Sequence, residues 1–351
     1  MSSETFDDMH DRPEEFSDFA ALPLETCRSI TALFDIKDQD ALKFQSKHVW
    51  LTRGAVTFGT LAVIAAIFGL SPFWTRWVTE RQLAAAESTV VFFAFSFAVY
   101  GLATSQKYKW LARRHQAELY RQMKFRFLIH PGVWQDADWL AHEKKKIEVY
   151  SDKSSLEEGI EAALPHGPFP ITEEQLPRQT FEQLVQYYMK ARLRPQMLYL
   201  DHRAQRNEYK DRFLAFLPAG LFFASVVAAA AHSGFSFLFG RVAEQQLNWA
   251  KVAALLAACL PVTAAWVRTV RAAFEYSRNK SRSIAAHRAL RELEDLLVRD
   301  SMNTVHGDGS SAPRKDVDPR PVLKELWWCE QIFATEHREW LRLMVETEWY
   351  G

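Results

Sequence analysis

The chain has 351 residues with 43 basic and 43 acidic side chains, so its formal net charge is zero and no charge excess points to nucleic acid as a partner. Its three cysteines, Cys27, Cys259 and Cys329, lie far apart and form no Cys-x-x-Cys or Cys/His cluster. A disulfide framework and a zinc site are therefore both unsupported, and the pattern indicates three free thiols.

The chain begins with an acidic segment. Seven of the first twenty residues are Asp or Glu and one is Arg. A secretory signal peptide has a basic start followed by an apolar run, so this segment is not one. Its composition predicts a disordered acidic tail over residues 1–21. A helix over residues about 22–50 is expected to follow and to lead into the first apolar run.

Four apolar runs come next, in two closely spaced pairs. A helix needs about 20 apolar residues to cross the hydrocarbon core of a bilayer. The runs cover about 54–75, 84–106, 213–238 and 249–268, and the last is short enough to need interfacial Lys251 and Trp249. The short connections within each pair predict two transmembrane hairpins. The expected fold is thus an all-α membrane protein with four spans.

Orientation follows from the distribution of Lys and Arg. The two loops within the pairs hold only Arg76, Arg81, Arg241 and Lys251, whereas the sequences on the other side are far richer in bases. By the positive-inside rule, both termini and the central segment are expected in the cytoplasm. These bases can also contact anionic lipid headgroups, although a role in topology alone is the simpler interpretation.

Long charged segments without internal Pro or Gly predict cytoplasmic helices after each pair of spans. A further helix precedes each pair, so the sequence has the organisation of a parallel duplication. The expected parts are a first unit at 22–128, a loop-rich cytoplasmic insertion at 129–178, a second unit at 179–299, a linker at 300–321 and a C-terminal amphipathic helix at 322–351.

Two apolar stripes indicate how these helices pack. Ala286, Leu290, Leu293 and Leu297 follow helical spacing, and so does a face of the C-terminal helix formed by Leu326, Cys329, Phe333, Trp340 and Leu343. We expect that face to pack on the helical bundle or on another subunit. The many Glu residues of the same helix make a position on anionic lipid a poorer fit.

Catalytic motifs are not found, and no enzyme activity, cofactor or metal is expected. The His115/Glu118 and His337/Glu336 pairs lack the additional ligands of a metal site, and the second pair is interpreted as a solvated face. The spans carry no internal Asp, Glu, Lys or Arg, which argues against a proton-coupled transporter.

The spans do carry small and mildly polar residues. Ala62 and Ala66, and the row Ala250, Ala254 and Ala258, allow close helix packing within or between subunits. Ser88, Thr89, Ser96 and Tyr100 form a polar stripe on the second span. Such a stripe can line water in an oligomer, but Ser and Thr can instead bond to their own helix backbone.

The order of these features resembles a known family. Paired spans followed by a long charged helix are similar to SLATT domains, the SMODS and SLOG-associating two-transmembrane modules of bacterial defence systems, here in tandem. The resemblance covers about 22–130 and 180–349 and is one of layout. It rests on stretches such as YKWLARRHQAELYRQMKFRFL after the second span and PVTAAWVRTVRAAFEYSRNKSRS across the end of the fourth, in which Phe274 and Glu275 match an aromatic–acid pair. The closing helix is similar at Glu336 and Trp340.

The resemblance implies an inner-membrane effector of an antiphage or conflict system. Such an effector oligomerises and permeabilises or depolarises the membrane when a nucleotide signal or a cytoplasmic sensor or nucleotide-generating partner triggers it. The chain has no attached SLOG, TIR or nucleotidyltransferase domain, which puts direct nucleotide binding in doubt. Arg271 and Glu275, one turn apart at the membrane boundary, are candidates for coupling helices to spans.

Two other functions remain open. A membrane anchor or scaffold that recruits a cytoplasmic enzyme is the principal alternative, and a constitutive ion channel is a weaker one because no selectivity-filter sequence is visible.

Overall fold

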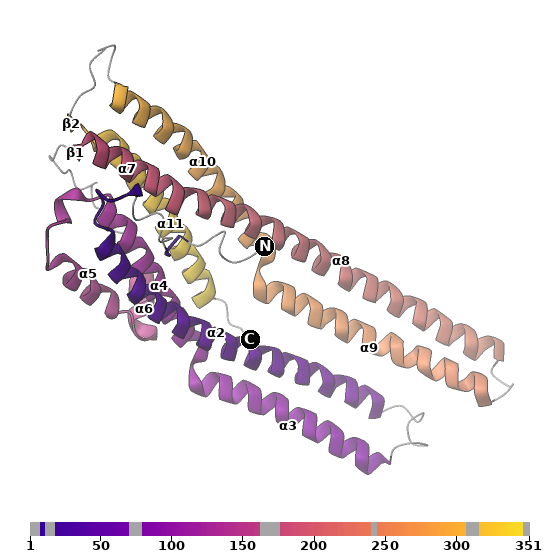
Figure 1. Ribbon diagram of the computed structural model, residues 1–351. Coiled ribbons are helices and arrows are strands. Elements are labelled where there is room, and N and C mark those ends of the chain that lie inside the picture. The colour runs from indigo at the N-terminus through magenta and orange to yellow at the C-terminus, as the bar shows by residue number, and fades with distance from the viewer. Residues whose placement is uncertain are drawn as a thin grey trace. The chain divides into compact units, whose positions relative to one another are not determined.

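The computed structural model describes residues 8–10, 18–69, 79–161, 176–239, 244–306 and 316–346. Most of the predicted acidic tail, the tips of both predicted hairpins and the middle of the predicted linker lie outside these ranges. The described residues are mostly helical, as the sequence predicted (Figure 1). In addition, the two-residue strands β1 (Leu176–Pro177) and β2 (Asp316–Val317) pair antiparallel, which the all-α expectation did not include.

The helices appear in chain order in Figure 1. They are α2 (Leu24–Gly69), α3 (Glu80–Thr104), α4 (Gln106–Leu128), α5 (Trp139–Glu148), α6 (Lys153–Glu161), α7 (Arg178–Tyr188), α8 (Arg194–Phe239), α9 (Glu244–Phe274), α10 (Tyr276–His306) and α11 (Arg320–Glu346). A 3-10 turn, Pro131–Val133, follows α4, and a π-helical turn, Met189–Leu193, joins α7 to α8. The segment 129–178, expected to be a loop-rich insertion with one or two short helices, holds α5 and α6.

The two halves of the chain share one order of elements. Each begins with a 46-residue helix, α2 or α8, and continues with an apolar helix, α3 or α9. Each apolar helix is separated from the next helix by one non-glycine residue with a left-handed backbone, Ser105 (φ 50°) or Glu275 (φ 42°). This conformation costs roughly 1–2 kcal/mol for an L-residue, so both breaks are held by their surroundings.

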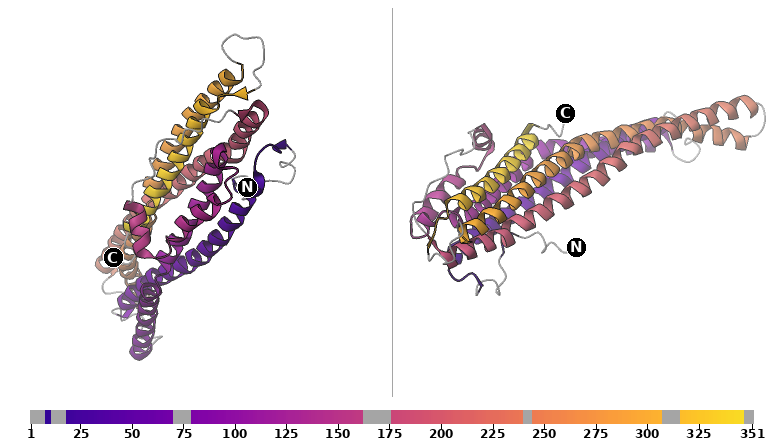
Figure 2. Two further views of the ribbon diagram at one scale, coloured as in Figure 1. Left: turned by 90° about the vertical axis from the view of Figure 1, so that its left-hand side faces the viewer. Right: turned by 90° about the horizontal axis from the view of Figure 1, so that it is seen from above.

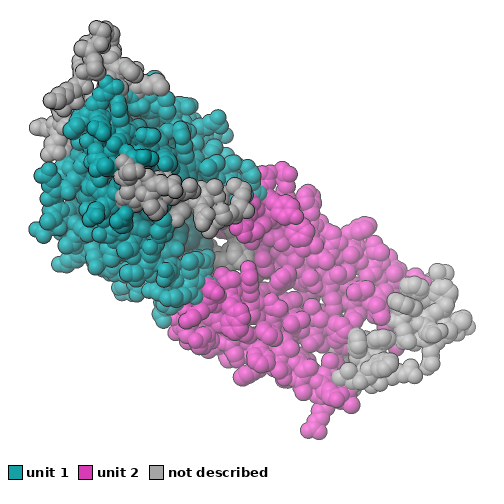
Figure 3. Space-filling model, viewed as in Figure 1, with its two compact units in different colours: residues 1–45, 107–205, 280–347 teal, residues 46–106, 206–279, 348–351 magenta. Residues whose placement is uncertain are grey.

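The structure has two compact units, and neither is one continuous part of the chain as the sequence had predicted. Residues 1–45, 107–205 and 280–347 form unit 1, and residues 46–106, 206–279 and 348–351 form unit 2 (Figure 3). Each unit therefore takes elements from both halves. Sequence reasoning followed chain order because local patterns do not reveal which distant helices share a core.

Unit 1 has a continuous apolar core. Leu290 and Leu297 of α10 are fully buried there, together with Leu326 and Cys329 of α11. Figure 2 shows α10 and α11 running alongside each other. The apolar face predicted for the C-terminal helix thus packs inside this unit. Burying one such leucine contributes about 1.5–3 kcal/mol, so α11 is held firmly.

Unit 2 contains two pairs of apolar helical segments. In the α2–α3 pair, Gly54 lets the ring of Phe97 approach to 2.9 Å of the position that a Cβ atom would take. In the α8–α9 pair, the Ser225 hydroxyl donates a hydrogen bond to the carbonyl of Ala257 (2.8 Å). Small or polar residues at these contacts are typical of helices that pack in lipid.

The outer surface of unit 2 is strongly apolar. Phe95, Phe216 and Phe223 are 66%, 75% and 71% exposed. Isolated exposed apolar residues are common in soluble proteins, but an extended surface of this kind marks contact with a membrane or a partner. Among the described residues, four helical segments are long and apolar enough to cross a membrane.

Candidate functional site

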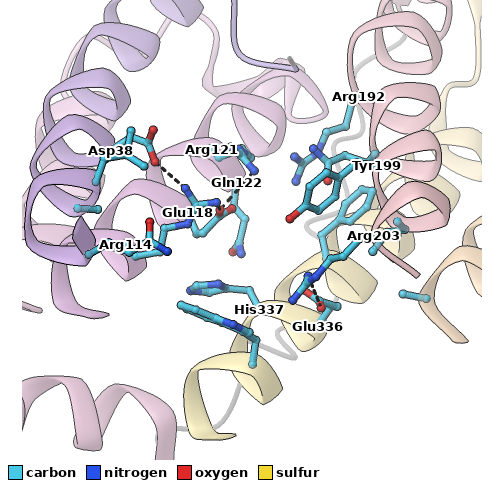
Figure 4. A pocket seen from close by; sticks show the side chains of 18 of the residues that line it. Asp38, Arg114, Glu118, Arg121, Gln122, Arg192, Tyr199, Arg203, Glu336 and His337 are labelled. Carbon is cyan, nitrogen blue, oxygen red and sulfur yellow. Dashed lines mark hydrogen bonds and ion pairs between the residues drawn. The ribbon is translucent and has the colours of Figure 1, made fainter. Parts of the chain in front are cut away.

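The helices of unit 1 line a partly open polar pocket of about 360 Å³ (Figure 4). This volume lies at the lower end of the about 300–1,000 Å³ typical of small-ligand pockets. Its walls come from α2, α4, the π-helical turn, α8, α10 and α11. Charged side chains dominate the lining, and the rings of Trp110, Tyr199 and Trp340 add planar surfaces.

One wall is a chain of ion pairs between α2 and α4. Arg114 contacts both Asp38 of α2 and Glu118, and Glu118 also pairs with Arg121 at 3.3 Å. The three α4 residues meet because positions three and four apart lie on one face of a helix. Burial by itself raises the pKa of Glu118, but Arg121 and Arg114 outweigh it and lower this pKa to about 2. The Glu118 side chain is therefore ionised at physiological pH.

The second wall is centred on Arg192, whose side chain is 2% exposed. Its guanidinium donates to both carboxylate oxygens of Glu330 on α11, at 2.9 and 3.0 Å. The rings of Phe125 and Phe333 lie 4.6 and 4.3 Å from its central carbon. Tyr188 donates a further hydrogen bond to Glu330 (2.7 Å). A buried, bidentate and stacked geometry of this kind is one that Arg supplies and Lys does not.

The π-helical turn explains how Arg192 reaches this position. π turns are rare and often occur at functional sites. Pro195 lies two residues after this turn, and a proline inside a helix has no N–H donor and clashes with the carbonyl four residues earlier. The turn Met189–Leu193 places Arg192 in the core, together with Met189 and Leu193.

The two walls are joined by Asp8, which is 3% exposed. Its carboxylate pairs with Arg192 and with Arg121 (3.4 Å) and accepts a hydrogen bond from Gln196 (2.8 Å). The neighbouring Met9 is 1% exposed, and its carbonyl accepts a hydrogen bond from the fully buried Lys124 (2.8 Å). The expectation of a disordered tail over 1–21 is thus wrong at Asp8 and Met9. Composition does not reveal the buried Arg192, Arg121 and Lys124 with which these two residues pair in the folded chain.

The third wall is on α11. Glu336 pairs with Arg203 (3.2 Å) and Arg282 (3.7 Å), and His337 lies 3.0 Å from His115 of α4, Nε2 to Nδ1. The interpretation of His337 as solvated is wrong, because both histidines are 8% exposed. Burial, and for His115 also the neighbouring His337, lowers the pKa of His115 to about 3 and that of His337 to about 4. The pair is neutral at physiological pH, with one ring donating to the other.

Among the residues that the structure describes, no group of three or more His, Cys, Asp or Glu is arranged to hold a metal. The pocket instead combines guanidinium donors with aromatic rings. The carboxylates of Asp38, Glu118 and Glu336 pair with these guanidinium groups, and the rings leave planar surfaces for a small polar molecule.

Comparisons with protein-family models, with curated protein sequences and with solved structures each find no match.

The predicted coupling residues lie in unit 2 and do not pair with each other. Arg271 pairs with Asp211 of α8 (2.9 Å), and Glu275 lies 3.6 Å from Arg278. The left-handed backbone of Glu275 ends α9, so the spacing of one helical turn that the expected pair requires is lost. A role of either residue in coupling stays a prediction.

The predicted polar stripe lies along one face of α3. Ser88, Thr89 and Tyr100 are exposed, and Ser96 is half-buried. The Thr89 hydroxyl donates to the carbonyl of Ala85 (2.7 Å), which is the backbone bond left open as an alternative. The pocket in unit 1 is a separate feature that sequence reasoning missed.

Proposed function

We propose that this protein is a multi-pass effector of the bacterial inner membrane, built from two tandem transmembrane hairpins with cytoplasmic helices. A nucleotide signal or a sensor partner engages the helical unit, and the chains then oligomerise and permeabilise or depolarise the membrane. The proposal assigns the chain no catalysis. Its place in an antiphage or conflict system comes from the resemblance to tandem SLATT modules.

One observation supports the proposal. Each of the four apolar segments either lies on a helix that lines the pocket or is followed directly by a helix that lines it. Asp38 lies on α2, which continues into the first segment, and Arg114 lies on α4, which follows the second. Arg203 lies on α8, which continues into the third, and Ala286 lies on α10, which follows the fourth. A ligand in this pocket can therefore act on every span through the backbone.

The physical mechanism is a shift between two helix packings. A ligand must bind the permeable packing about 10⁴-fold more tightly, or by about 5.5 kcal/mol, to move the population from 1:99 to 99:1. A buried network of charge pairs supplies energies of this size when it rearranges. The left-handed residues Ser105 and Glu275, placed directly after α3 and α9, are suitable points for the helices to reorient.

The test is the membrane potential of cells that express the full chain with its genomic partners during phage challenge. The proposal predicts loss of potential and of viability in cells carrying the gene. Intact potential and viability in those cells would contradict it. The scaffold alternative predicts that full-length protein in liposomes does not leak, even with its trigger bound.

A further inference from the structure

Asp8 lies buried behind the pocket wall, where its carboxylate contacts three residues that line the pocket. It belongs to none of the helices that form the wall, and it lies 184 residues before Arg192 in the chain. Its carboxylate contacts Arg121, Arg192 and Gln196, and all three of these side chains line the cavity. Arg192 and Gln196 donate hydrogen bonds to this carboxylate, and the Arg121 guanidinium adds a positive charge 3.4 Å away, which together are the features of an oxyanion site.

The ion pairs of the three walls hold equal numbers of arginines and carboxylates when Asp8 is counted. In the described residues, five arginines (Arg114, Arg121, Arg192, Arg203 and Arg282) face five carboxylates (Asp8, Asp38, Glu118, Glu330 and Glu336) through the ion pairs of the three walls. Without Asp8 the site has an excess positive charge in a buried setting. Such a charge requires an anion, because an unpaired buried charge is costly.

We infer that Arg121, Arg192 and Gln196 form an oxyanion site for the carboxylate or phosphate group of a small ligand, and that the chain's own Asp8 fills this site in the present state. The ligand group carries the same charge as Asp8 and accepts the same hydrogen bonds. The rest of the ligand extends into the cavity of about 360 Å³ between the charged walls. Ligand and N-terminal segment therefore compete.

The described part of the N-terminal segment makes further contacts, and the Met9 side chain is buried in the apolar core of unit 1. The Met9 carbonyl accepts bonds from Thr31 (3.1 Å) and Lys124 (2.8 Å), and His10 forms an exposed pair with Asp35 (3.0 Å). Exposed pairs of this kind contribute at most about 1 kcal/mol. Release of Asp8 thus removes the carboxylate that links Arg121 of α4 to Arg192 of the π-helical turn. The inference deepens the proposed ligand pocket, but its test needs neither a membrane potential nor a phage.

The first experiment measures hydrogen exchange of the wild-type full chain in detergent, in sodium phosphate, sodium acetate and sodium chloride at equal ionic strength. Competition predicts faster exchange in the peptide that contains residues 8–10 in phosphate than in chloride. The same acceleration in acetate would identify carboxylate as an equally accepted group, and acceleration in phosphate alone would identify phosphate. Equal exchange in all three salts would overturn the inference.

The second experiment compares two variants that remove one negative charge from the same segment. Asp8→Asn removes the carboxylate charge that competes for the site, whereas Asp18→Asn removes the same charge at an exposed position. Calorimetric titration with inorganic phosphate should show about ten-fold or tighter binding to Asp8→Asn than to Asp18→Asn, because loss of the competing carboxylate leaves the two guanidinium groups for the ligand. Equal affinity of two folded variants would overturn the inference. If Asp8→Asn does not fold, the exchange experiment on the wild type decides.

Discussion

Replacing Arg192 with Met tests whether the buried charge network organises unit 1. Met keeps most of the apolar volume of the side chain but leaves the carboxylates of Glu330 and Asp8 buried without their guanidinium partner. Removing one member of a buried ion pair costs about 3–5 kcal/mol. For a cooperative unit of 150–250 residues, about 2–4 °C per kcal/mol converts this cost to a fall in Tm of roughly 6–20 °C.

Arg194→Met is the matched control, because it makes the same change two residues away. Arg194 has 65% of its side-chain surface exposed and pairs with Glu294 at 3.4 Å. A surface pair of this kind contributes about 0–1 kcal/mol, so this variant should melt within a few degrees of the wild type. The assay is thermal unfolding of the full chain in detergent, with helical content checked by circular dichroism.

A double-mutant cycle with Glu330→Gln separates the ion pair from general damage. Removing both charges relieves the unpaired carboxylate, so the two changes together should cost less than the sum of the single changes by about 1–3 kcal/mol. A fall in Tm for Arg192→Met no larger than for Arg194→Met, or strictly additive costs, would refute the buried network.

Two further predictions concern other parts of the chain. The pKa of His115 is about 3 and that of His337 about 4, whereas an unfolded histidine titrates near 6.5. The contribution of these neutral histidines to stability is therefore fully present above pH 6.5 and is lost as the pH falls toward 4. At pH 5 the loss is about 2 kcal/mol per histidine. His337→Gln should weaken this pH dependence in thermal melts. In α2, Gly54→Ala forces the Phe97 ring to move and should cost about 1–3 kcal/mol, whereas Gly59→Ala meets no atom within 4 Å and should be neutral or stabilising. Equal melting temperatures of these two alanine variants would contradict the α2–α3 packing.

The helical segments could be predicted because a long uncharged run permits few structures. A backbone in lipid must satisfy its own hydrogen bonds, so runs such as 54–75 predict helices directly. The stripe that includes Leu290 and Leu297 was equally readable, since the spacing of a helix fixes which residues share a face.

The pocket could not be predicted in the same way, because its members meet only in the folded chain. Arg192 and Glu330 are 138 residues apart, and Asp8 lies in a segment whose composition favours disorder. A partial signal was present. Arg192 continues the stripe of Phe181, Leu184 and Tyr188 at helical spacing, and a charged residue on a buried face requires a partner. Which partner it finds depends on tertiary structure.

The most direct test of the coupling between pocket and spans compares two variants on α11 in the phage-challenge assay. Glu336→Gln removes the carboxylate shared by Arg203 and Arg282, whereas Glu346→Gln alters an exposed pair with Arg342 on the same helix. We measure the rate at which the membrane potential falls in cells with equal amounts of each full-length variant. The account predicts that cells with Glu346→Gln lose their membrane potential at the wild-type rate. In cells with Glu336→Gln this rate should change by about ten-fold or more, which corresponds to about 1.4 kcal/mol in the equilibrium between the two helix packings. Equal rates for the two variants would contradict it.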